Sequence, residues 1–455
     1  MKLKEKKVLV FGTGLSGIAA AELLWQSGAY PVLFDGNTET KEADVRAKLP
    51  EGCEAEIIIG ELPKEVINSL ELVVLSPGVP TDLPLVKTLR EKLPIWGEVE
   101  LAYNFGRGDV LAITGTNGKT TTTSLLGAIM KHAKDSTFIV GNIGIPYTRV
   151  TRSMKDSSVT VAEISSFQLE TIDRFHPRVS AILNITPDHL NRHHTMEEYI
   201  RVKELITVNQ TAEDTCVLNY EDEILRAFGE TLKCRVLFFS SLRKLDKGIY
   251  LNGDMIEYSD GSSRIHICST RELKLPGRHN HENVMAAVAM ALAYGISIEE
   301  IVYVVKRFTA VEHRIEYVAE VDGVVYYNDS KGTNPDAAIK GIQAMDRPTL
   351  LIGGGYDKDS SYDEWIQAFD GKVRYLVLIG QTREKIADAA RKNGFYDIVL
   401  KDTLEEAVAF CASHAQKGDA VLLSPACASW GMFPNYEVRG NVFKEQVRAL
   451  EKTVS

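Results

Sequence analysis

The chain is poor in cysteine. Its 455 residues include only six cysteines, and these are scattered, with no C-x-x-C pair and no spacing typical of metal ligands. They stand at positions 53, 216, 234, 268, 411 and 427. This usage argues against a disulfide scaffold and against a cysteine-ligated metal. It indicates a reduced compartment, the cytoplasm.

Long apolar runs are absent too. The most apolar helical stretch, Met285–Tyr294, falls far short of the roughly 18 residues that a membrane span needs. The first residues, MKLKEKKVLVFG, pass directly from charges to a strand and a glycine turn, without an apolar signal region or a cleavage site. We therefore expect neither a signal peptide nor a membrane anchor.

The charge balance argues against another class of partner. The chain carries 52 Lys and Arg against 62 Asp and Glu, which gives a formal net charge of −10. An acidic chain argues against general binding of nucleic acid or anionic membranes, although a local basic pocket for a small anion stays open. The sequence has no coiled-coil heptads and no long exposed apolar face. A monomer that binds small molecules is the expectation.

Strands alternate with helices from end to end, which is typical of α/β proteins. At about 150 residues per domain, the length predicts three domains. From two junctions, near Pro94 and Phe308, we predict domains at 1–97, 98–308 and 309–455. Mostly parallel sheets are expected, Rossmann-like in the first and third domains and of the P-loop ATPase type in the centre. Strands are expected at 8–11, 31–34, 72–75, 109–113, 159–162, 179–185, 349–352, 375–379, 398–400 and 420–423, with helices ending near residue 25 and at 120–131, 197–208 and 280–294.

A glycine turn follows the first strand. Gly12-Thr13-Gly14-Leu15-Ser16-Gly17 stands between a strand and a helix, and Asp35 ends the second strand. Such glycines let the backbone approach a diphosphate at a helix amino end, and the acid can bind a ribose hydroxyl. The first domain is scarcely long enough for two mononucleotide-binding halves. A diphosphate ligand other than NAD fits better, and glycines that merely tighten the turn stay an alternative.

The stronger phosphate motif is Gly115-Thr116-Asn117-Gly118-Lys119-Thr120, with Thr121 next in the helix. Consecutive amide groups and a helix amino end form an anion cradle. Lys119 is expected to neutralise β- and γ-phosphate charge, and the Thr120 hydroxyl to ligate Mg²⁺. The spacing is two residues shorter than that of the usual phosphate loop. The motif predicts ATP binding.

Carboxylates and imidazoles follow the next two strands. Glu163 stands after one strand, and Asp188 and His189 follow the other. The carboxyl ends of parallel strands are where α/β sheets place ligands, and Mg²⁺ needs oxygen ligands there. A helix-start charge for Glu163 and a packed or N-capping role for His189 are the alternatives. His193 and His194 are expected to be solvated, since a paired-His metal site needs further ligands at suitable spacing.

Six segments occur in one order over nearly the whole chain, and together they resemble the Mur ligase family. They are GTNGKTTT, EISSFQLE, NITPDHLNRH, GRHNHEN, NDSKGTNPDA and LSPACASWGMF. The short phosphate loop is the normal form in that family. The resemblance is closest to the members that add D-glutamate to UDP-N-acetylmuramoyl-L-alanine in peptidoglycan synthesis.

The resemblance implies an ATP-dependent amide ligase. In such enzymes a UDP-linked carboxylate attacks the γ-phosphate to form an acyl phosphate, and an amine then displaces phosphate through a tetrahedral intermediate. Such a site needs several cationic groups, because it brings together the negatively charged oxygens of the phosphates and of the carboxylate. Lys119, Thr120, Glu163 and His189 match the family's phosphate and Mg²⁺ positions, and two Mg²⁺ ions are implied. Asn142 and His189 match residues close to the reacting acyl group.

Lys203 matches a lysine that is carbamylated in many family members. A neutral amine can add CO₂ and become a bidentate anion that holds a second Mg²⁺. The residues by themselves favour another interpretation, a lysine paired with Tyr199 or Thr207 on a solvated helix face. Only the resemblance makes Lys203 a catalytic and metal-binding candidate.

The resemblance also implies three sets of binding residues. The ATP positions are matched by Asn280, Asn283, Arg314, Asp329 and Lys331. The D-glutamate positions are matched by Thr333, Lys358, Ser429 and Tyr436. The UDP positions are matched by Gly14, Leu15, Ser16 and Asp35. Helix caps for the two asparagines, a hinge charge for Arg314 and a surface position for Lys358 stay alternatives.

Other functions compete with this interpretation. A related ligase, such as a folylpolyglutamate synthase, would share the central motifs but differ in the first domain and the amino-acid pocket. An NAD-dependent oxidoreductase rests only on the first glycine turn with Asp35, and it leaves Lys119, Glu163 and His189 unexplained. A non-catalytic nucleotide-binding regulator would not need these charged positions.

Overall fold

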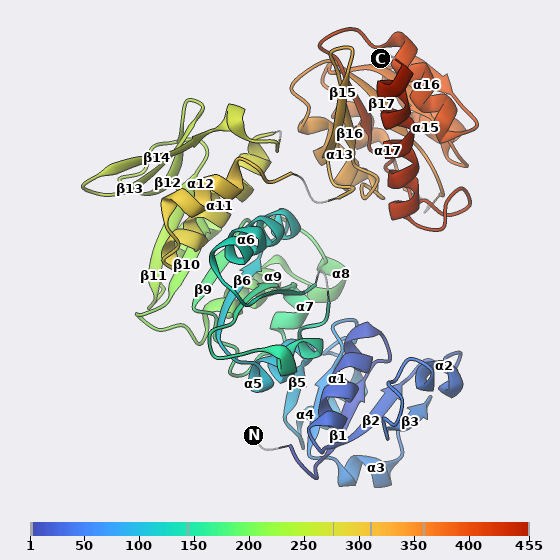
Figure 1. Ribbon diagram of the computed structural model, residues 1–455. Coiled ribbons are helices and arrows are strands. Elements are labelled where there is room, and N and C mark those ends of the chain that lie inside the picture. The colour runs from blue at the N-terminus through green and yellow to red at the C-terminus, as the bar shows by residue number, and fades with distance from the viewer. Residues whose placement is uncertain (1–2, 143–144, 276, 310–311, 358–359, 454–455) are drawn as a thin grey trace. The chain divides into compact units, whose positions relative to one another are not determined.

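The computed structural model describes residues 3–142, 145–275, 277–309, 312–357 and 360–453 (Figure 1). The chain divides into two compact units. The first consists of Met1–Cys268 and Glu282–Val305, and the second of Ser269–His281 and Lys306–Ser455. Among the helices in the described part of the chain, none combines the length and apolar character that crossing a bilayer requires.

The first unit begins with a five-stranded parallel sheet in the order β3-β2-β1-β4-β5. Side chains alternate along each strand, so Val8 and Val10 pack with α1 and α5 on one face, while Leu9 and Phe11 pack with α4 on the other. The glycine turn follows β1 at the carboxyl edge of this sheet. The elements are β1 (Lys7–Phe11), α1 (Leu15–Gln26), β2 (Tyr30–Asp35), α2 (Glu42–Arg46), β3 (Glu56–Ile59), α3 (Lys64–Ser69), β4 (Leu72–Leu75), α4 (Pro84–Arg90), β5 (Ile95–Gly97) and α5 (Glu98–Phe105).

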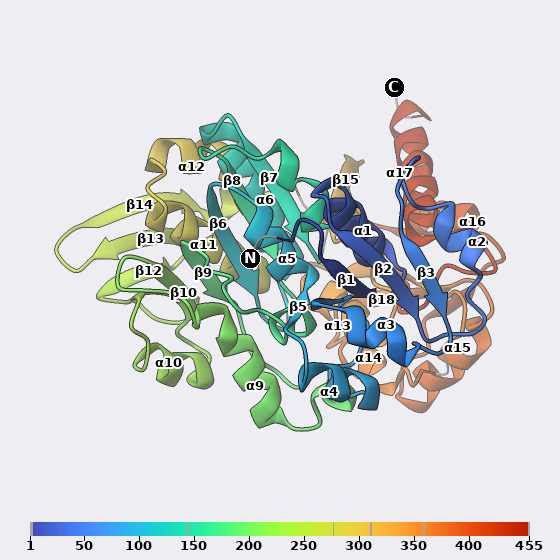
Figure 2. The same cartoon turned by 90° about the horizontal axis from the view of Figure 1, so that it is seen from below.

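The second sheet of this unit has nine strands in the order β14-β13-β12-β11-β10-β9-β6-β8-β7. From β7 to β12 all neighbours are parallel, and β12 pairs antiparallel with β13. Figure 2 shows β12, β13 and β14 at one edge of the sheet. The strands are β6 (Asp109–Thr114), β7 (Thr137–Gly141), β8 (Val159–Glu163), β9 (Val179–Ile182), β10 (Thr215–Asn219), β11 (Arg235–Ser240), β12 (Lys247–Asn252), β13 (Met255–Asp260) and β14 (Arg264–Ser269).

Helices cover this nine-stranded sheet. Apolar residues of α5, α7, α9 and α10 pack on it in one cluster, which includes Ala112, Ala162 and Leu218 from its strands. Helix α6 packs against β7 and β8 and against α12. The helices are α6 (Lys119–Ala133), α7 (Ser166–Leu169), α8 (Leu190–His193), α9 (Met196–Glu204), α10 (Glu223–Gly229), α11 (Arg278–Ala293) and α12 (Ile298–Val305), with short 3₁₀ turns η1 (Tyr147–Arg149), η2 (Thr151–Ser153), η3 (Leu205–Thr207) and η4 (Thr270–Glu272).

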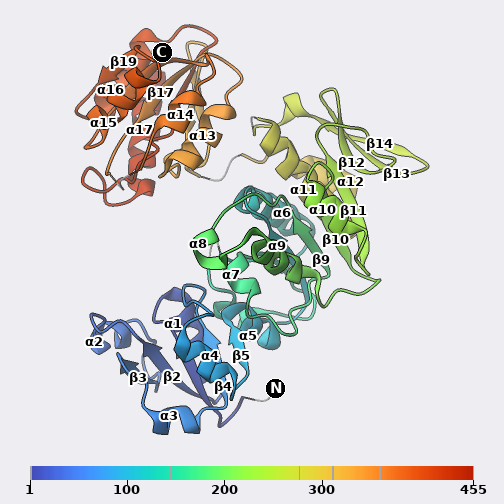
Figure 3. The same cartoon turned by 180° about the vertical axis from the view of Figure 1, so that it is seen from behind.

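The second unit holds a six-stranded sheet in the order β15-β16-β20-β17-β18-β19. Only β15 is antiparallel to its neighbour, among the strand pairs described. Helices α13, α14 and α15 share one apolar cluster with the sheet, and α16 and α17 share the cluster on its other face (Figure 3). The elements are β15 (Glu316–Val321), β16 (Val324–Asn328), α13 (Pro335–Gln343), β17 (Thr349–Gly353), α14 (Asp363–Gln367), β18 (Val373–Leu378), α15 (Arg383–Lys392), β19 (Ile398–Leu400), α16 (Leu404–His414), β20 (Ala420–Leu423) and α17 (Tyr436–Thr453).

The predicted α/β architecture with mostly parallel sheets is confirmed. The predicted strand at 375–379 runs from Val373 to Leu378, and a larger correction concerns β9. We predicted a strand at 179–185, but β9 ends at Ile182. Beyond it, Asn184 turns toward the phosphate loop, where its carbonyl accepts from the Thr116 amide at 2.9 Å and its side chain bonds Asn117. The chain leaves the sheet there because the loop supplies these hydrogen bonds instead. The domain limits 1–97, 98–308 and 309–455 stay predictions.

Candidate functional site

The loop Gly115–Gly118 joins the carboxyl end of β6 to the amino end of α6. Gly115 has φ 145° and Gly118 has φ 85°, a region that side chains rarely adopt. A Cβ atom on Gly118 would lie 2.1 Å from Asn283 Oδ1, so only glycine fits where the loop meets α11. The Asn117 amide donates to Asn184 Oδ1 at 2.8 Å. These contacts hold the loop at the ligand-binding edge of the sheet, with a helix amino end behind it.

Two ammonium groups meet at the carbonyl of Gly115. Lys119 Nζ lies 2.8 Å and Lys203 Nζ 2.9 Å from this oxygen. Lys203 is 1% exposed, and its ammonium group lies 4.7 Å from the ring centroid of Tyr199. Burial, together with the charge of Lys119, lowers the pKa of Lys203 to about 7. Near neutral pH, a substantial fraction of the Lys203 side chains is therefore neutral and nucleophilic.

The solvated helix face that the residues alone suggested for Lys203 is wrong. Tyr199, Val202 and Lys203 form the buried side of α9. The Tyr199 hydroxyl lies 3.1 Å from Thr116 Oγ1, so this side faces the phosphate loop. The predicted partner Tyr199 does contact the lysine, but inside the protein.

Glu163 and Asn142 form a second part of the site, on the strands beside β6. Glu163 ends β8, opposite Ile113 of β6. Its Oε1 accepts from Asn142 Nδ2 at 2.8 Å, and its carbonyl accepts from the Asn142 amide at 2.8 Å. Its Oε2 is buried and has no hydrogen-bond partner among the described residues. A buried carboxylate oxygen without a hydrogen-bond donor is a suitable ligand for a cation.

His189 adopts an uncommon backbone conformation at the start of α8. Its φ is 53°, and its amide donates to Asp188 Oδ1 at 2.9 Å. The imidazole packs against Phe167, with ring centroids 4.9 Å apart, and is about half exposed. Strained backbone of this kind concentrates at functional sites. The packed alternative for His189 is therefore only partly correct, since about half of its side chain is exposed. His189 does occupy the N-cap position of α8, but its side chain makes no capping hydrogen bond.

The predicted metal ligands Thr120, Glu163 and His189 lie at or beyond the carboxyl ends of β6, β8 and β9, and Lys203 reaches the Gly115 carbonyl from α9. Among the described residues, no group of three or more His, Cys, Asp or Glu could hold a metal ion. The predicted ligand set is of another kind, because two of its four ligands would be the Thr120 hydroxyl and a carbamylated Lys203. The unpartnered Glu163 Oε2 and the low pKa of Lys203 both fit a cation held by oxygen ligands.

The solvated position expected for His193 is wrong. His193 is 3% exposed, and its Nε2 lies 2.9 Å from Ser166 Oγ. Its ring stacks on Phe167 at 5.5 Å, and burial lowers its pKa. His194 is exposed, as predicted, and lies 3.3 Å from Asp82. The two histidines differ in burial because helix α8 ends between them. Their spacing in the sequence gives no sign of this difference.

The residues expected to contact UDP lie at the first glycine turn. Gly14 caps α1, Leu15 is 75% exposed, and Ser16 is half-buried beside it. Asp35 accepts from Thr13 Oγ1 at 2.5 Å and from the Asn37 amide at 3.0 Å. An apolar side chain exposed at the amino end of a helix suits a ligand with both a ring and phosphates.

Most of the residues predicted to bind ATP or D-glutamate outside the phosphate loop lie on loops of the second unit. Thr333 and Lys331 follow β16, Ser429 follows β20, and Tyr436 begins α17. Lys331 Nζ lies 5.6 Å from the ring centroid of Tyr436. Lys358 lies outside the described residues. Asn280 and Asn283 are both buried in α11, and Arg314 has a buried Nε without a hydrogen-bond partner among the described residues.

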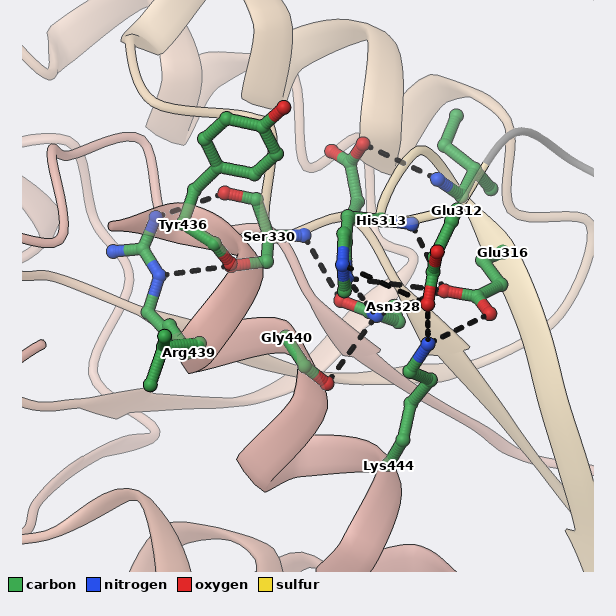
Figure 4. A network of polar contacts seen from close by, with 12 residues as sticks. Glu312, His313, Glu316, Asn328, Ser330, Tyr436, Arg439, Gly440 and Lys444 are labelled. Carbon is green, nitrogen blue, oxygen red and sulfur yellow. Dashed lines mark hydrogen bonds and ion pairs between the residues drawn. The ribbon is translucent and has the colours of Figure 1, made fainter. Parts of the chain in front are cut away.

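A buried arginine, which the sequence reasoning missed, organises these loops (Figure 4). Arg439 is 1% exposed, and burial lowers its pKa to about 10. Its guanidinium donates to the Ser330 carbonyl at 2.8 Å, to Ser330 Oγ at 3.0 Å and to the Cys427 carbonyl at 3.2 Å. Ser330 Oγ donates onward to the Tyr436 carbonyl at 2.8 Å. The loops after β16 and β20 are therefore tied to α17.

A second group of polar contacts in Figure 4 holds the segment before β15. Asn328 is fully buried, and its Nδ2 donates to Glu316 Oε2 at 3.0 Å and lies 2.9 Å from His313 Nδ1. The Lys331 amide donates to the His313 carbonyl at 2.9 Å. Lys444 pairs with Glu316 at 3.3 Å. A charged residue on a terminal helix usually indicates a solvated surface, so the sequence alone does not reveal these contacts.

Asp329 carries a titratable carboxyl in the same region. Its Oδ2 accepts from Ser424 Oγ at 2.7 Å, and its Oδ1 accepts from the Ile315 amide at 3.3 Å. Burial outweighs these hydrogen bonds and raises the pKa of the carboxyl from 3.8 to about 7.

We expect Asp329→Asn to change how stability depends on pH. Between about pH 4 and 7 the unfolded chain loses a proton that the folded chain keeps, so the wild type loses up to about 4 kcal/mol of stability as the pH rises. The Asn variant does not titrate there. The unfolding temperature of the variant minus that of the wild type should therefore rise by several degrees between about pH 4 and 7 and stay constant above about pH 7. A temperature difference that is the same at all pH values would contradict this assignment.

Three family models match the chain, and each covers most of one of the three sheets. The family models that match are "Mur ligase MurD-like, N-terminal domain" at residues 6–95, "Mur ligase middle domain" at 113–291 and "Mur ligase, glutamate ligase domain" at 313–427.

Curated relatives match over the full length. The chain is 58% identical over 452 residues to the UDP-N-acetylmuramoylalanine--D-glutamate ligase of Lachnoclostridium phytofermentans, covering 99% of this chain and all of that protein. It is 47% identical over 454 residues to the enzyme of that name from Clostridioides difficile, with 99% and 100% covered. Solved structures share the fold. MurF from Acinetobacter baumannii has a TM-score of 0.60 at 17% identity, covering 96% of this chain and 93% of that one, and MurC from Thermotoga maritima has 0.58 at 18%, covering 98% and 99%.

Proposed function

The chain belongs to the Mur ligase family, and from this membership we infer that it is an ATP-dependent ligase that adds D-glutamate to UDP-N-acetylmuramoyl-L-alanine. The reaction releases ADP and phosphate and belongs to peptidoglycan synthesis. The observation that carries the proposal is the meeting of Lys119 and Lys203 at the carbonyl of the phosphate loop. High identity to D-glutamate ligases over the whole chain supports this substrate over that of a folate-type ligase.

The reaction proceeds in two chemical steps. In the first, the alanyl carboxylate attacks the γ-phosphorus of ATP, the bond to the bridging oxygen breaks, and ADP leaves an acyl phosphate behind. In the second, the D-glutamate amine attacks the acyl carbon, and the tetrahedral intermediate expels phosphate and gives up the amine proton. Both steps bring anions together, so fixed cations and amide donors lower the barrier.

We assign the ATP phosphates to the loop Gly115–Thr121. Its amides and the amino end of α6 would bind phosphate oxygens, with Lys119 neutralising the β- and γ-phosphates. Asn142 and His189 lie at the same sheet edge and would contact the reacting acyl group. The adenine is assigned to Asn280 and Asn283. Arg314, Asp329 and Lys331 are assigned to ATP as well, because they match further ATP positions of the family.

We assign magnesium to Thr120, Glu163, His189 and carbamylated Lys203, and propose two ions. Bound Mg²⁺ would neutralise the phosphate oxygens and polarise the transferred phosphoryl group. The unpartnered Glu163 oxygen supports this assignment, because a buried carboxylate oxygen without a donor fits an oxygen-coordinated cation. The low pKa of Lys203 supports its modification, because only the neutral amine adds CO₂.

The remaining assignments concern the two organic substrates. UDP is assigned to Gly14, Leu15, Ser16 and Asp35 at the first glycine turn. The two carboxylates of D-glutamate are assigned to Thr333, Lys358, Ser429 and Tyr436, whose cation and hydroxyl donors suit them. We propose a cytoplasmic location, because both ATP and a UDP-linked precursor are consumed. That the chain is a monomer stays a prediction.

The first test is phosphate release from ATP with UDP-N-acetylmuramoyl-L-alanine and one amino acid at a time. We expect release with D-glutamate and at least about 100-fold less with L-glutamate, L-lysine or L-alanine, since a site built to pair both carboxylates leaves buried donors unpaired with the wrong amino acid. Release with none of the four would overturn the substrate assignment.

A further inference from the structure

One largely shielded carboxylate accepts hydrogen bonds from two segments that lie far apart in the sequence. Glu170, directly after α7, accepts from Thr81 Oγ1 at 2.9 Å and from Arg192 Nη2 at 2.9 Å. His193 Nδ1 lies 3.5 Å from its other oxygen. The side chains of Glu170 and Arg192 are only 10% and 14% exposed. This pair is therefore shielded from water, unlike the surface pairs that contribute little.

Arg192 carries the connection further into the loop after β4. Its Nη2 also donates to the carbonyl of Val79 at 3.1 Å. The Val79 amide donates to Ser76, and Ser76 Oγ donates to the carbonyl of Gly12 at 3.3 Å. The loop 76–81 thus forms a wall beside the first glycine turn, to which the UDP part of the substrate is assigned.

The other end of the same cluster reaches the reacting centre. The Arg192 guanidinium lies 4.8 Å from the ring centroid of Phe167, and this ring also contacts the rings of His193 and His189. His189 is the residue with the uncommon backbone conformation. Contacts therefore run without a gap from the wall of the glycine turn to the imidazole beside the phosphate loop.

We propose that Glu170 is a positioning residue, which holds the loop 76–81 against α8 so that a substrate bound by its UDP part presents its carboxylate next to His189. This inference rests on the proposed function. Burying an ion pair costs free energy that the pair itself scarcely recovers, so its presence here points to a geometric role. A substrate anchored at one end loses rate when the distance between its anchor and the reacting atoms becomes variable.

Thr81 offers the mildest test, because replacing it removes one half-buried hydroxyl and leaves no charge unpaired. We expect Thr81→Val to raise KM for UDP-N-acetylmuramoyl-L-alanine about fivefold, the equivalent of one hydrogen bond, while KM for ATP changes less than twofold. Thr81→Ser should restore the wild-type value. Glu170→Gln, which weakens all three contacts, should raise the same KM at least tenfold and lower kcat as well.

Thr88→Val is the matched control, since the exposed Thr88 donates to the Pro84 carbonyl of its own helix α4 at 3.0 Å. Thermal unfolding of every variant separates altered positioning from loss of fold. A KM for the UDP substrate that stays at the wild-type value in Thr81→Val and Glu170→Gln overturns the inference. So does a rise that Thr88→Val reproduces or that extends equally to ATP. Failure of the proposed function looks different, because the wild type itself then releases no phosphate with D-glutamate.

Discussion

Lys119→Ala is expected to abolish phosphate release while the protein stays folded. Removing the cation from the phosphate loop should lower kcat by about 10³-fold or more, since charge stabilisation is most of what catalyses phosphoryl transfer. The fold should tolerate the change, because Lys119 Nζ donates to the carbonyls of Gly115 and Thr116 within the loop, and the Gly115 carbonyl keeps Lys203 as a donor. Steady-state phosphate release and thermal unfolding check the two halves of this expectation.

The control for Lys119→Ala is Lys131→Ala, an exposed lysine in the last turn of the same helix. It removes an equal charge from α6 at the end away from the loop and should leave kcat within twofold. Normal turnover in Lys119→Ala would contradict the loop assignment. A second effect is expected too. Because the charge of Lys119 helps to lower the pKa of Lys203, its removal should raise that pKa, so the two lysines should not act additively.

Part of the parallel-strand framework was predictable from the sequence. Buried parallel strands are short continuous apolar runs, and Leu72–Leu75, Ile398–Leu400 and Ala420–Leu423 agree residue for residue with the prediction. The antiparallel strands at the sheet edges were missed. So were the parallel strands β3, β5, β7, β10 and β11. The pair β15 and β16 turns at Asp322-Gly323, both with positive φ, which is a strong hairpin signal that the sequence displays.

The loop residues of the site were predictable, and the buried charged residues were not. A phosphate loop can be recognised in the sequence because its glycines, lysine and threonine are close together in one short stretch. Lys203, His193 and Arg439 are different, since each lies on a helix and nothing in its local pattern separates a buried charge from a solvated one. Their burial depends on which helix face the fold turns inward, and that is decided by distant residues such as Gly115 and Ser330.

Lys203→Ala is the second large expected effect, and CO₂ is its most informative probe. If a carbamate on Lys203 holds a metal ion, the variant should lose at least about 100-fold in kcat, since removing a residue that merely orients a metal ligand already costs about 10- to 100-fold. Wild-type enzyme kept in CO₂-free buffer should lose activity and regain it when bicarbonate is added. Phosphate release during both treatments is the measurement.

The pH dependence of this recovery identifies the amine that reacts. With a pKa of about 7, Lys203 is mostly protonated at about pH 6 and mostly neutral at about pH 8, so at equal dissolved CO₂ activity should return several-fold faster at the higher pH. Lys203→Arg is the matched variant, because it keeps a positive charge near the Gly115 carbonyl but forms no carbamate under these conditions. Full activity in Lys203→Arg, or a wild type indifferent to CO₂, would show that the lysine acts as a simple cation, and the second magnesium ion would then need another ligand.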